Sequence, residues 1–135
     1  MAKEIPSEVK TLKYWCKLLG LMDWNIVLET NVSPDEMTVE GADGCVDYVE
    51  SIKAARIQIV DENQKKKNNE NEKLYSLRPF DFEETLVHEL LHLKFCLLER
   101  GSNWEKKTQL RVLHQIVDDI ARALVSAKRY NKESE

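Results

Sequence analysis

The sequence predicts one α+β domain with helices at both ends and a small sheet between them. Apolar residues recur with helical spacing near the N-terminus and again along two longer segments of the C-terminal half. Three short runs rich in β-branched and aromatic residues lie between these segments. The expected order is therefore helix, three strands, long loop and two helices, with a small antiparallel or mixed sheet.

The composition is that of one soluble globular domain over residues 1–135, long enough to fold without disulfides. Hydrophobic residues make up 42% and charged residues 33%, as in ordinary soluble proteins. The net charge of −4 gives no reason to expect nucleic acid as a partner. The odd, widely spaced Cys16, Cys45 and Cys96 predict reduced, packed thiols.

No segment approaches the roughly 18 apolar residues of a membrane span, and the N-terminus lacks the apolar region of a secretion signal. We therefore expect a cytoplasmic protein with no membrane partner. Nothing in the sequence indicates an oligomeric state.

The first helix is expected to start at Ser7, which follows Pro6 and can cap it, and to end at Gly20 in a left-handed conformation. Leu21 then fits the apolar contact of a Schellman motif. The apolar side of this helix consists of Val9, Leu12, Tyr14, Trp15, Leu18 and Leu19.

Residues 24–30 predict the first strand, and the segment 31–38 with its proline ends it. Two further runs, 45–49 and 54–60, predict a hairpin.

The second run of this hairpin alternates apolar residues with Arg56 and Gln58, as in a strand with one buried and one solvated face. We expect this strand at the sheet edge, where an extended peptide can pair with it. A covered or merely charged edge is the equal alternative.

Residues 61–78 form a long polar stretch that leads into the next helix and is a candidate lid. Its lysine triplet, 65–67, is expected to be a solvated loop tip rather than a phosphate or nucleic-acid site.

After Pro79, the pair Asp81 and Glu84 has the spacing of a helix start, and Gly101 is expected to end this helix, whose apolar pattern covers residues 81–99. Its core-facing seam consists of Leu86, Leu90, Leu93 and Leu97.

Ser102 and Glu105 repeat the start signal for the last helix, which is expected to run to about Lys128. The seam of this helix consists of Leu110, Leu113, Val117, Ile120 and Leu124.

The helix over 81–99 carries the pentapeptide His88-Glu89-Leu90-Leu91-His92, an H-E-x-x-H motif. Histidines four residues apart lie on one helix face, so both imidazoles can bind one metal ion. Glu89 points elsewhere and is placed to act as general base on a water at that ion. The alternative, a surface or capping pair of histidines, is less consistent with this helical context.

His114 lies at the edge of the apolar seam of the last helix and is the expected third ligand. A histidine beside such a seam can instead be an ordinary core residue. Asp118, Glu99 and Glu105 therefore remain alternative third ligands.

The stretch Thr-Leu-Val-His88-Glu89-Leu-Leu-His92-Leu, placed after a helix and a short sheet, resembles the active-site helix of minimal zincins. These include the SprT-like and ImmA/IrrE-like groups and small metallopeptidases of phages and prophages. The resemblance covers most of the chain in element order, while its specific part is the pentapeptide with its flanks. It implies a zincin-like fold in which a sheet covers the active-site helix.

By this resemblance, the strand over residues 54–60 would align a peptide substrate and His114 would complete the zinc site. The chain lacks the H-x-x-G-x-x-H continuation of metzincins and the later Glu-x-x-x-Asp pair of gluzincins. With all three histidines used as ligands, Tyr48, Tyr75 or Arg78 would have to stabilise the oxyanion.

The leading hypothesis is a zinc metallopeptidase, with His88, His92 and His114 holding one Zn²⁺ ion and Glu89 as the catalytic base, acting on a peptide or protein substrate. One alternative is a metal-binding interaction or regulatory module without activity. Another is a closed structural zinc site with Asp118 or Glu99 as fourth ligand.

Overall fold

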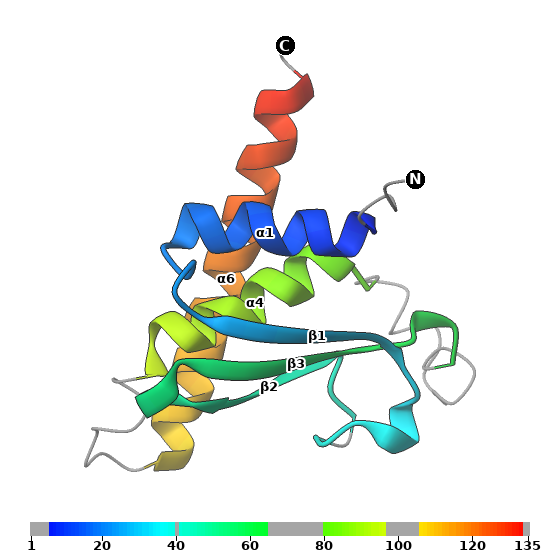
Figure 1. The fold of residues 1–135 in the computed structure, drawn as a ribbon, viewed down its shortest axis with the longest axis vertical. Coiled ribbons are helices and arrows are strands. Elements are labelled where there is room, and N and C mark those ends of the chain that lie inside the picture. The colour runs from blue at the N-terminus through cyan, green and yellow to red at the C-terminus, as the bar shows by residue number, and fades with distance from the viewer. Residues whose placement is uncertain (1–5, 40, 65–79, 97–105, 134–135) are drawn as a thin grey trace.

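The computed structural model has the predicted α+β architecture (Figure 1). It describes residues 6–39, 41–64, 80–96 and 106–133. The elements are α1 (Ser7–Leu19), β1 (Asn25–Val32), the 3₁₀ turn η1 (Pro34–Glu36), β2 (Gly44–Val49), the 3₁₀ turn η2 (Glu50–Ile52), β3 (Ala54–Val60), α4 (Phe82–Lys94) and α6 (Lys106–Glu133). The candidate lid lies mostly outside the described residues, which resume at Phe80.

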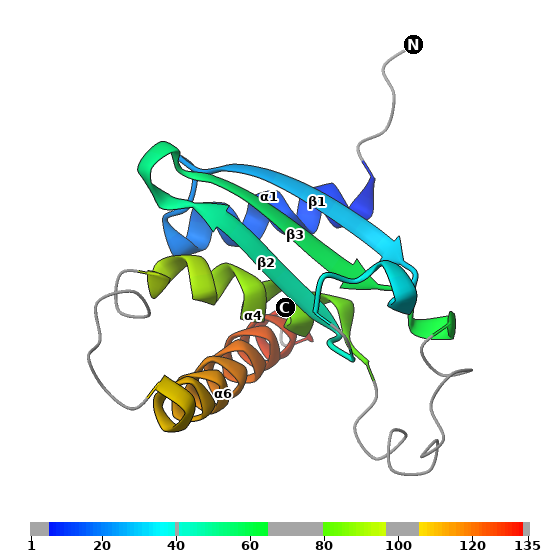
Figure 2. The same ribbon diagram turned by 90° about the horizontal axis from the view of Figure 1, so that it is seen from below.

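The sheet has the strand order β1-β3-β2, with β3 parallel to β1 and antiparallel to β2. The predicted hairpin of β2 and β3 is therefore confirmed. The prediction that residues 54–60 form an edge was wrong, because β3 is the central strand (Figure 2). Alternation of polar and apolar residues reports which face of a strand is covered, and says nothing about whether its edges are paired.

The N-cap of α1 lies one residue before Ser7, the residue that the sequence predicts as the cap. Pro6 occupies the N-cap position and Ser7 is the first helical residue, with no side-chain cap. The predicted C-terminal end is confirmed, since Gly20 has φ 73° and the Leu21 N–H donates to the Cys16 carbonyl oxygen over 2.7 Å. Leu21 is buried, in line with the apolar contact that often accompanies a Schellman motif.

α4 begins as the sequence predicts, because the Asp81 side chain caps the Glu84 N–H over 3.1 Å. The helix ends at Lys94, earlier than the expected Glu99, and Phe95 takes the C-cap position. Cys96, just after this C-cap, is again helical and is buried, and the rest of the predicted segment lies outside the described residues. Gly101 lies outside the described residues.

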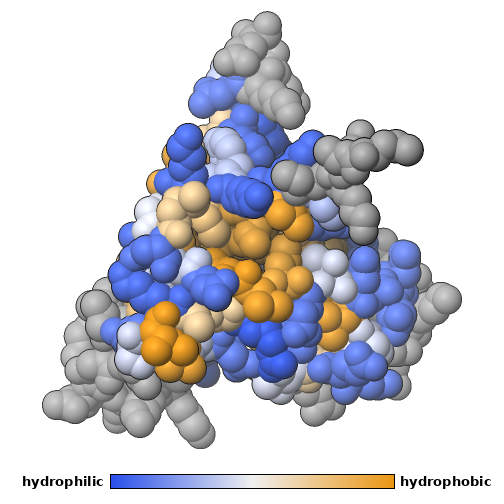
Figure 3. Space-filling view, in the orientation of Figure 1, coloured by the Kyte–Doolittle hydropathy of each residue, from blue (hydrophilic) through white to orange (hydrophobic). Residues whose placement is uncertain are grey.

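The core lies between the sheet and α1 and α4, with α6 packed on α4. In Figure 3 apolar side chains gather at the centre of the face between α1 and β1. The fully or nearly fully buried core residues include Trp15, Leu21, Ile57, Ile59, Leu86, Val87, Leu90, Val117, Ala121 and Val125.

The buried stripe of α6 differs from the predicted seam. Val117 is buried as expected, but the stripe continues through Ala121 and Val125, while Ile120 and Leu124 are only partly buried. A small residue lets two helices approach closely, so the contact centre need not follow the largest side chains. The helix also runs beyond the expected Lys128, to Glu133.

All three cysteines are buried thiols outside any disulfide, as predicted. Burial raises the pKa of the Cys16 thiol to about 11. Within the described part of the chain, no helix combines the length and apolar character needed to cross a membrane.

Candidate metal centre

α4 presents His88 and His92 on one face, as their spacing predicts. Their Nε2 atoms are 3.2 Å apart, His92 is buried and His88 is half-buried. The leucines on the core side of α4 fix its rotation, since Leu86 and Leu90 are fully buried. The packing of one face of this helix therefore directs its histidine face into the neighbouring cleft.

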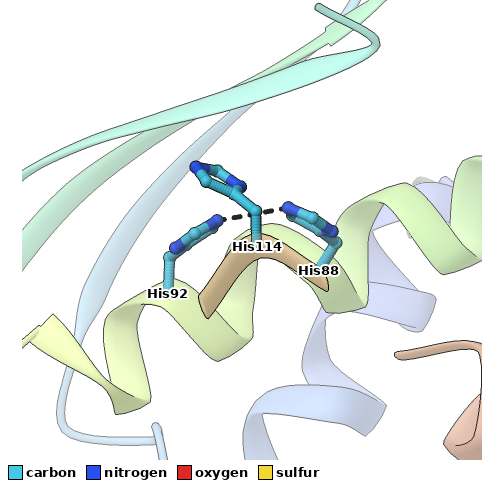
Figure 4. Close-up of side chains that lie close together, drawn as sticks. All are labelled: His88, His92 and His114. Atoms are coloured by element: carbon cyan, nitrogen blue, oxygen red, sulfur yellow. Dashed lines mark hydrogen bonds between the residues drawn. The ribbon is translucent and has the colours of Figure 1, made fainter. Parts of the chain in front are cut away.

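His114 reaches the same place from α6 (Figure 4). Its ring centroid lies 4.6 Å from that of His92 and 5.7 Å from that of His88. One ligand atom from each of the three imidazoles lies within 4.8 Å of the others. These histidines are therefore close enough to bind one metal ion, and His114 is exposed rather than an ordinary core residue.

Asp118, which the sequence also allowed as third ligand, lies one turn after His114 on α6. Its Oδ1 atom is 3.5 Å from Nδ1 of His88, on the side of that ring away from the Nε2 atom that faces His92. Arg122 donates to the second oxygen of Asp118 over 2.8 Å. Asp118 is therefore placed to orient a ligand. Glu99 and Glu105, the remaining acidic candidates for the third ligand, lie outside the described residues.

Glu89 is buried beside the three imidazoles without being one of the grouped ligands. Its Oε1 atom is 3.9 Å from Nε2 of His88. A carboxylate at this distance from a ligand nitrogen can contact a water at the ion while leaving coordination to the histidines.

The charge state of His88 suits a metal ligand. Burial, together with the neighbouring His92 and His114, lowers the pKa of His88 to about 4, although Asp118 opposes this effect. The imidazole is therefore neutral at pH 7, the form that coordinates metals. A cluster of three imidazole donors fits a borderline cation such as Zn²⁺.

A cleft of about 530 Å³ opens over these residues, between β2, α4 and α6. β2 lines it with the preceding segment, whereas no residue of β3 does. Tyr48 of β2 lies in the wall, while Tyr75 and Arg78, the two further oxyanion candidates, are outside the described residues. The lining residues are Val39, Ala42, Asp43, Gly44, Cys45, Val46, Tyr48, Phe80, Asp81, Glu84, Thr85, His88, Glu89, His92, His114 and Asp118.

Sequence reasoning missed two features of this site. It suggests Asp118 only as a ligand, although the spacing of four residues from His114 already places both on one face of a helix. It gives Gly44 no role, and no sequence signal shows how closely this residue approaches α4.

Among the described residues, two helices thus bring three imidazoles and a buried carboxylate into one cleft. No protein-family model, curated protein or solved structure matches this chain.

Proposed function

We propose that this protein is a zinc-dependent peptidase. The observation that carries the proposal is the grouping of His88, His92 and His114 in an open cleft, with the Glu89 carboxylate beside them. Three protein ligands leave the fourth tetrahedral position to water or substrate, which is the pattern of catalytic zinc.

When bound, Zn²⁺ would lower the pKa of a water molecule and polarise the substrate carbonyl. Glu89 accepts the proton of the attacking water and then donates it to the leaving amine. Asp118 accepts a hydrogen bond from the Nδ1–H group of His88, which fixes the tautomer with Nε2 free for the metal. Proton transfer is thus assigned to Glu89, and the orientation of one ligand to Asp118.

We assign substrate alignment to β2 instead of the strand expected from the sequence. β2 lines the cleft and pairs with β3 in regular register from Gly44 to Val49. The opposite sheet edge, β1, has an irregularity between Glu29 and Val32, where Asn31 has φ 55°. A bulged edge resists further pairing, whereas a regular edge can hold an extended peptide by main-chain hydrogen bonds.

An open site favours catalysis over a structural zinc site. A closed structural site needs a fourth protein ligand. Asp118, the expected fourth ligand of such a site, instead lies at Nδ1 of His88, and His114 is exposed and lines the open cleft.

Glu89→Gln tests the proposed activity, because it keeps the shape of the side chain and removes its basicity. Zinc content should stay at the wild-type level, while hydrolysis of a mixed pool of quenched fluorescent peptides should fall by about 10²-fold or more. Asp119→Asn, an exposed change on α6, is the control and should keep full activity.

A wild-type protein that binds zinc but cleaves nothing in the pool would contradict the peptidase assignment. If zinc-loaded wild type and Glu89→Gln bound a peptide from the pool with equal affinity and neither cleaved it, the protein would instead be a metal-binding interaction module. Equal cleavage by wild type and Glu89→Gln would remove Glu89 from the mechanism.

A further inference from the structure

The first residue of β2, Gly44, lies directly against α4. A Cβ atom added there would be 2.7 Å from Cγ2 of Thr85, 3.3 Å from the carbonyl oxygen of Gln58 and 3.4 Å from Cγ of Glu89. Gly44 does not have a positive φ. The need for glycine therefore comes from close contact with these neighbours, and not from backbone conformation.

The nearest neighbour cannot easily turn away. Thr85 donates its hydroxyl proton to the Asp81 carbonyl oxygen over 2.8 Å, which holds its side-chain rotamer. A β-branched residue in a helix also has little freedom at χ1. The second neighbour is backbone of the central strand, so a side chain at position 44 has to displace β2 or the turn of α4 that carries Glu89.

Resting on the proposed function, we propose that Gly44 is a positioning residue for Glu89. The bare backbone of Gly44 lets β2 pack down on the turn of α4 that bears Thr85 and Glu89. The methylene groups of Glu89 are held under the strand, and its carboxylate stays 3.9 Å from Nε2 of His88. The same contact sets the distance between β2, the proposed substrate-aligning edge, and the helix that carries His88 and His92.

Co²⁺ substitution gives a readout that needs no substrate, since the visible spectrum of protein-bound Co²⁺ depends on the groups around the ion. We would record it at one pH for wild type, Glu89→Gln, Gly44→Ala, Thr85→Ser and Gly44→Ala/Thr85→Ser. Serine keeps the hydroxyl that bonds to Asp81 and lacks the Cγ2 methyl, so the double variant relieves the closest contact.

The expected result is a shifted spectrum for Glu89→Gln, a shift of Gly44→Ala in the same direction, and recovery of the wild-type spectrum in the double variant. Thr85→Ser alone should match wild type. All variants should keep Co²⁺ affinity within about threefold, because no histidine lies among the three nearest contacts of the added Cβ.

A Gly44→Ala spectrum identical to that of wild type would overturn the inference. So would a Gly44→Ala/Thr85→Ser variant whose spectrum does not return to that of wild type. If Gly44→Ala alone does not fold, the Co²⁺ spectrum of the folded Gly44→Ala/Thr85→Ser variant is compared with that of wild type instead. A double variant that does not fold either would also overturn the inference. A wild-type protein that does not bind Co²⁺ would instead refute the metal site. A wild-type site that binds Co²⁺ and hydrolyses no peptide would refute only the proposed activity.

Discussion

At the level of single residues, the two ring nitrogens of His88 face different partners. Nε2 faces His92 at 3.2 Å, and Nδ1 faces Asp118 at 3.5 Å. An acceptor at Nδ1 keeps the proton on that nitrogen and leaves Nε2 free, which favours metal binding. In the proposed site, the side chain of Asp118 would thus act on a bound metal through His88.

We predict that Asp118→Ala weakens zinc affinity by about 10-fold to 100-fold without removing the site. Competition with a fluorescent zinc chelator measures this change. The matched control is Asp119→Ala, because Asp119 also contacts Arg122, over 3.3 Å, but is exposed. Equal affinities of the two variants would show that Asp118 has no part in orienting His88.

The same residues show what a sequence can predict about a site. His88, Glu89 and His92 lie within one pentapeptide, so the geometry of one helix already relates them. The contribution of His114 depends on how α4 and α6 pack, and the shifted centre of that packing was not visible in the sequence. The structure was therefore needed to place the ring of His114 4.6 Å from that of His92.

Among the elements, α4 is tied at its start to both neighbouring helices. Glu83 accepts hydrogen bonds from Trp15 of α1, over 2.7 Å, and from Lys128 of α6. Asp81 accepts two from Arg129 of α6. These contacts fix the end of α4 that leads into the turn carrying His88.

The acidic residues in these contacts make stability depend on pH. Burial opposes ionisation of Asp81, but the hydrogen bonds and charge of Arg129 together with the backbone N–H groups of Glu84 and Glu83 outweigh burial, and the pKa of Asp81 is lowered. The pKa of Glu83 is lowered in the same way, with Lys128 and Trp15 outweighing burial. Since both pKa values are lower in the folded protein, their stabilisation is complete above about pH 4 to 5 and is lost as the pH falls through the folded values.

We predict that Glu83→Gln lowers the free energy of unfolding by about 1–3 kcal/mol at pH 7, because a hydrogen-bonded charge is removed from a partly buried position. Urea unfolding measures the difference, which should shrink at pH 3. Glu36→Gln, the same change at an exposed position, should stay within about 0.5 kcal/mol of wild type. A difference for Glu83→Gln that is constant between pH 7 and 3 would contradict the role of its charge.

Sequence periodicity predicts where the strands lie along the chain, but it does not predict the order of the strands in the sheet. It predicted the strands and the hairpin, because burial on one face leaves a pattern of period two. The strand order was not accessible, because pairing uses backbone groups that every residue carries. Gln58 illustrates the difficulty, since its polar side chain predicts a solvated residue, yet it is buried and its amide donates to Glu29.

Across the whole molecule, the proposed metal would join α4 to α6. These two helices pack against each other, and the three histidines extend their contact into the cleft. A ligand bound by the folded state alone stabilises it by mass action. Metal loading should therefore add to the stability of the entire chain.

We predict that Zn²⁺ at 100 times its dissociation constant raises the free energy of unfolding by about 2.7 kcal/mol at pH 7. Thermal or urea unfolding with excess Zn²⁺ and with a chelator gives the difference. Mg²⁺, which prefers oxygen ligands, should have no comparable effect. In His114→Ala, Zn²⁺ should add much less to the free energy of unfolding. In the presence of the chelator, the free energy of unfolding of this variant should stay near that of wild type, since His114 is exposed.

The proposed function depends above all on whether His88, His92 and His114 together bind one zinc ion. The most direct measurement is the zinc content of wild type and of the three single alanine variants after dialysis against zinc-free buffer, determined by mass spectrometry of the metal. We expect about one Zn²⁺ per wild-type chain and loss of most of it in each variant, because each imidazole supplies one of three bonds. Full occupancy in any one of the variants would remove that histidine from the site, and a wild-type protein without zinc affinity would contradict the metal site and the proposed activity together.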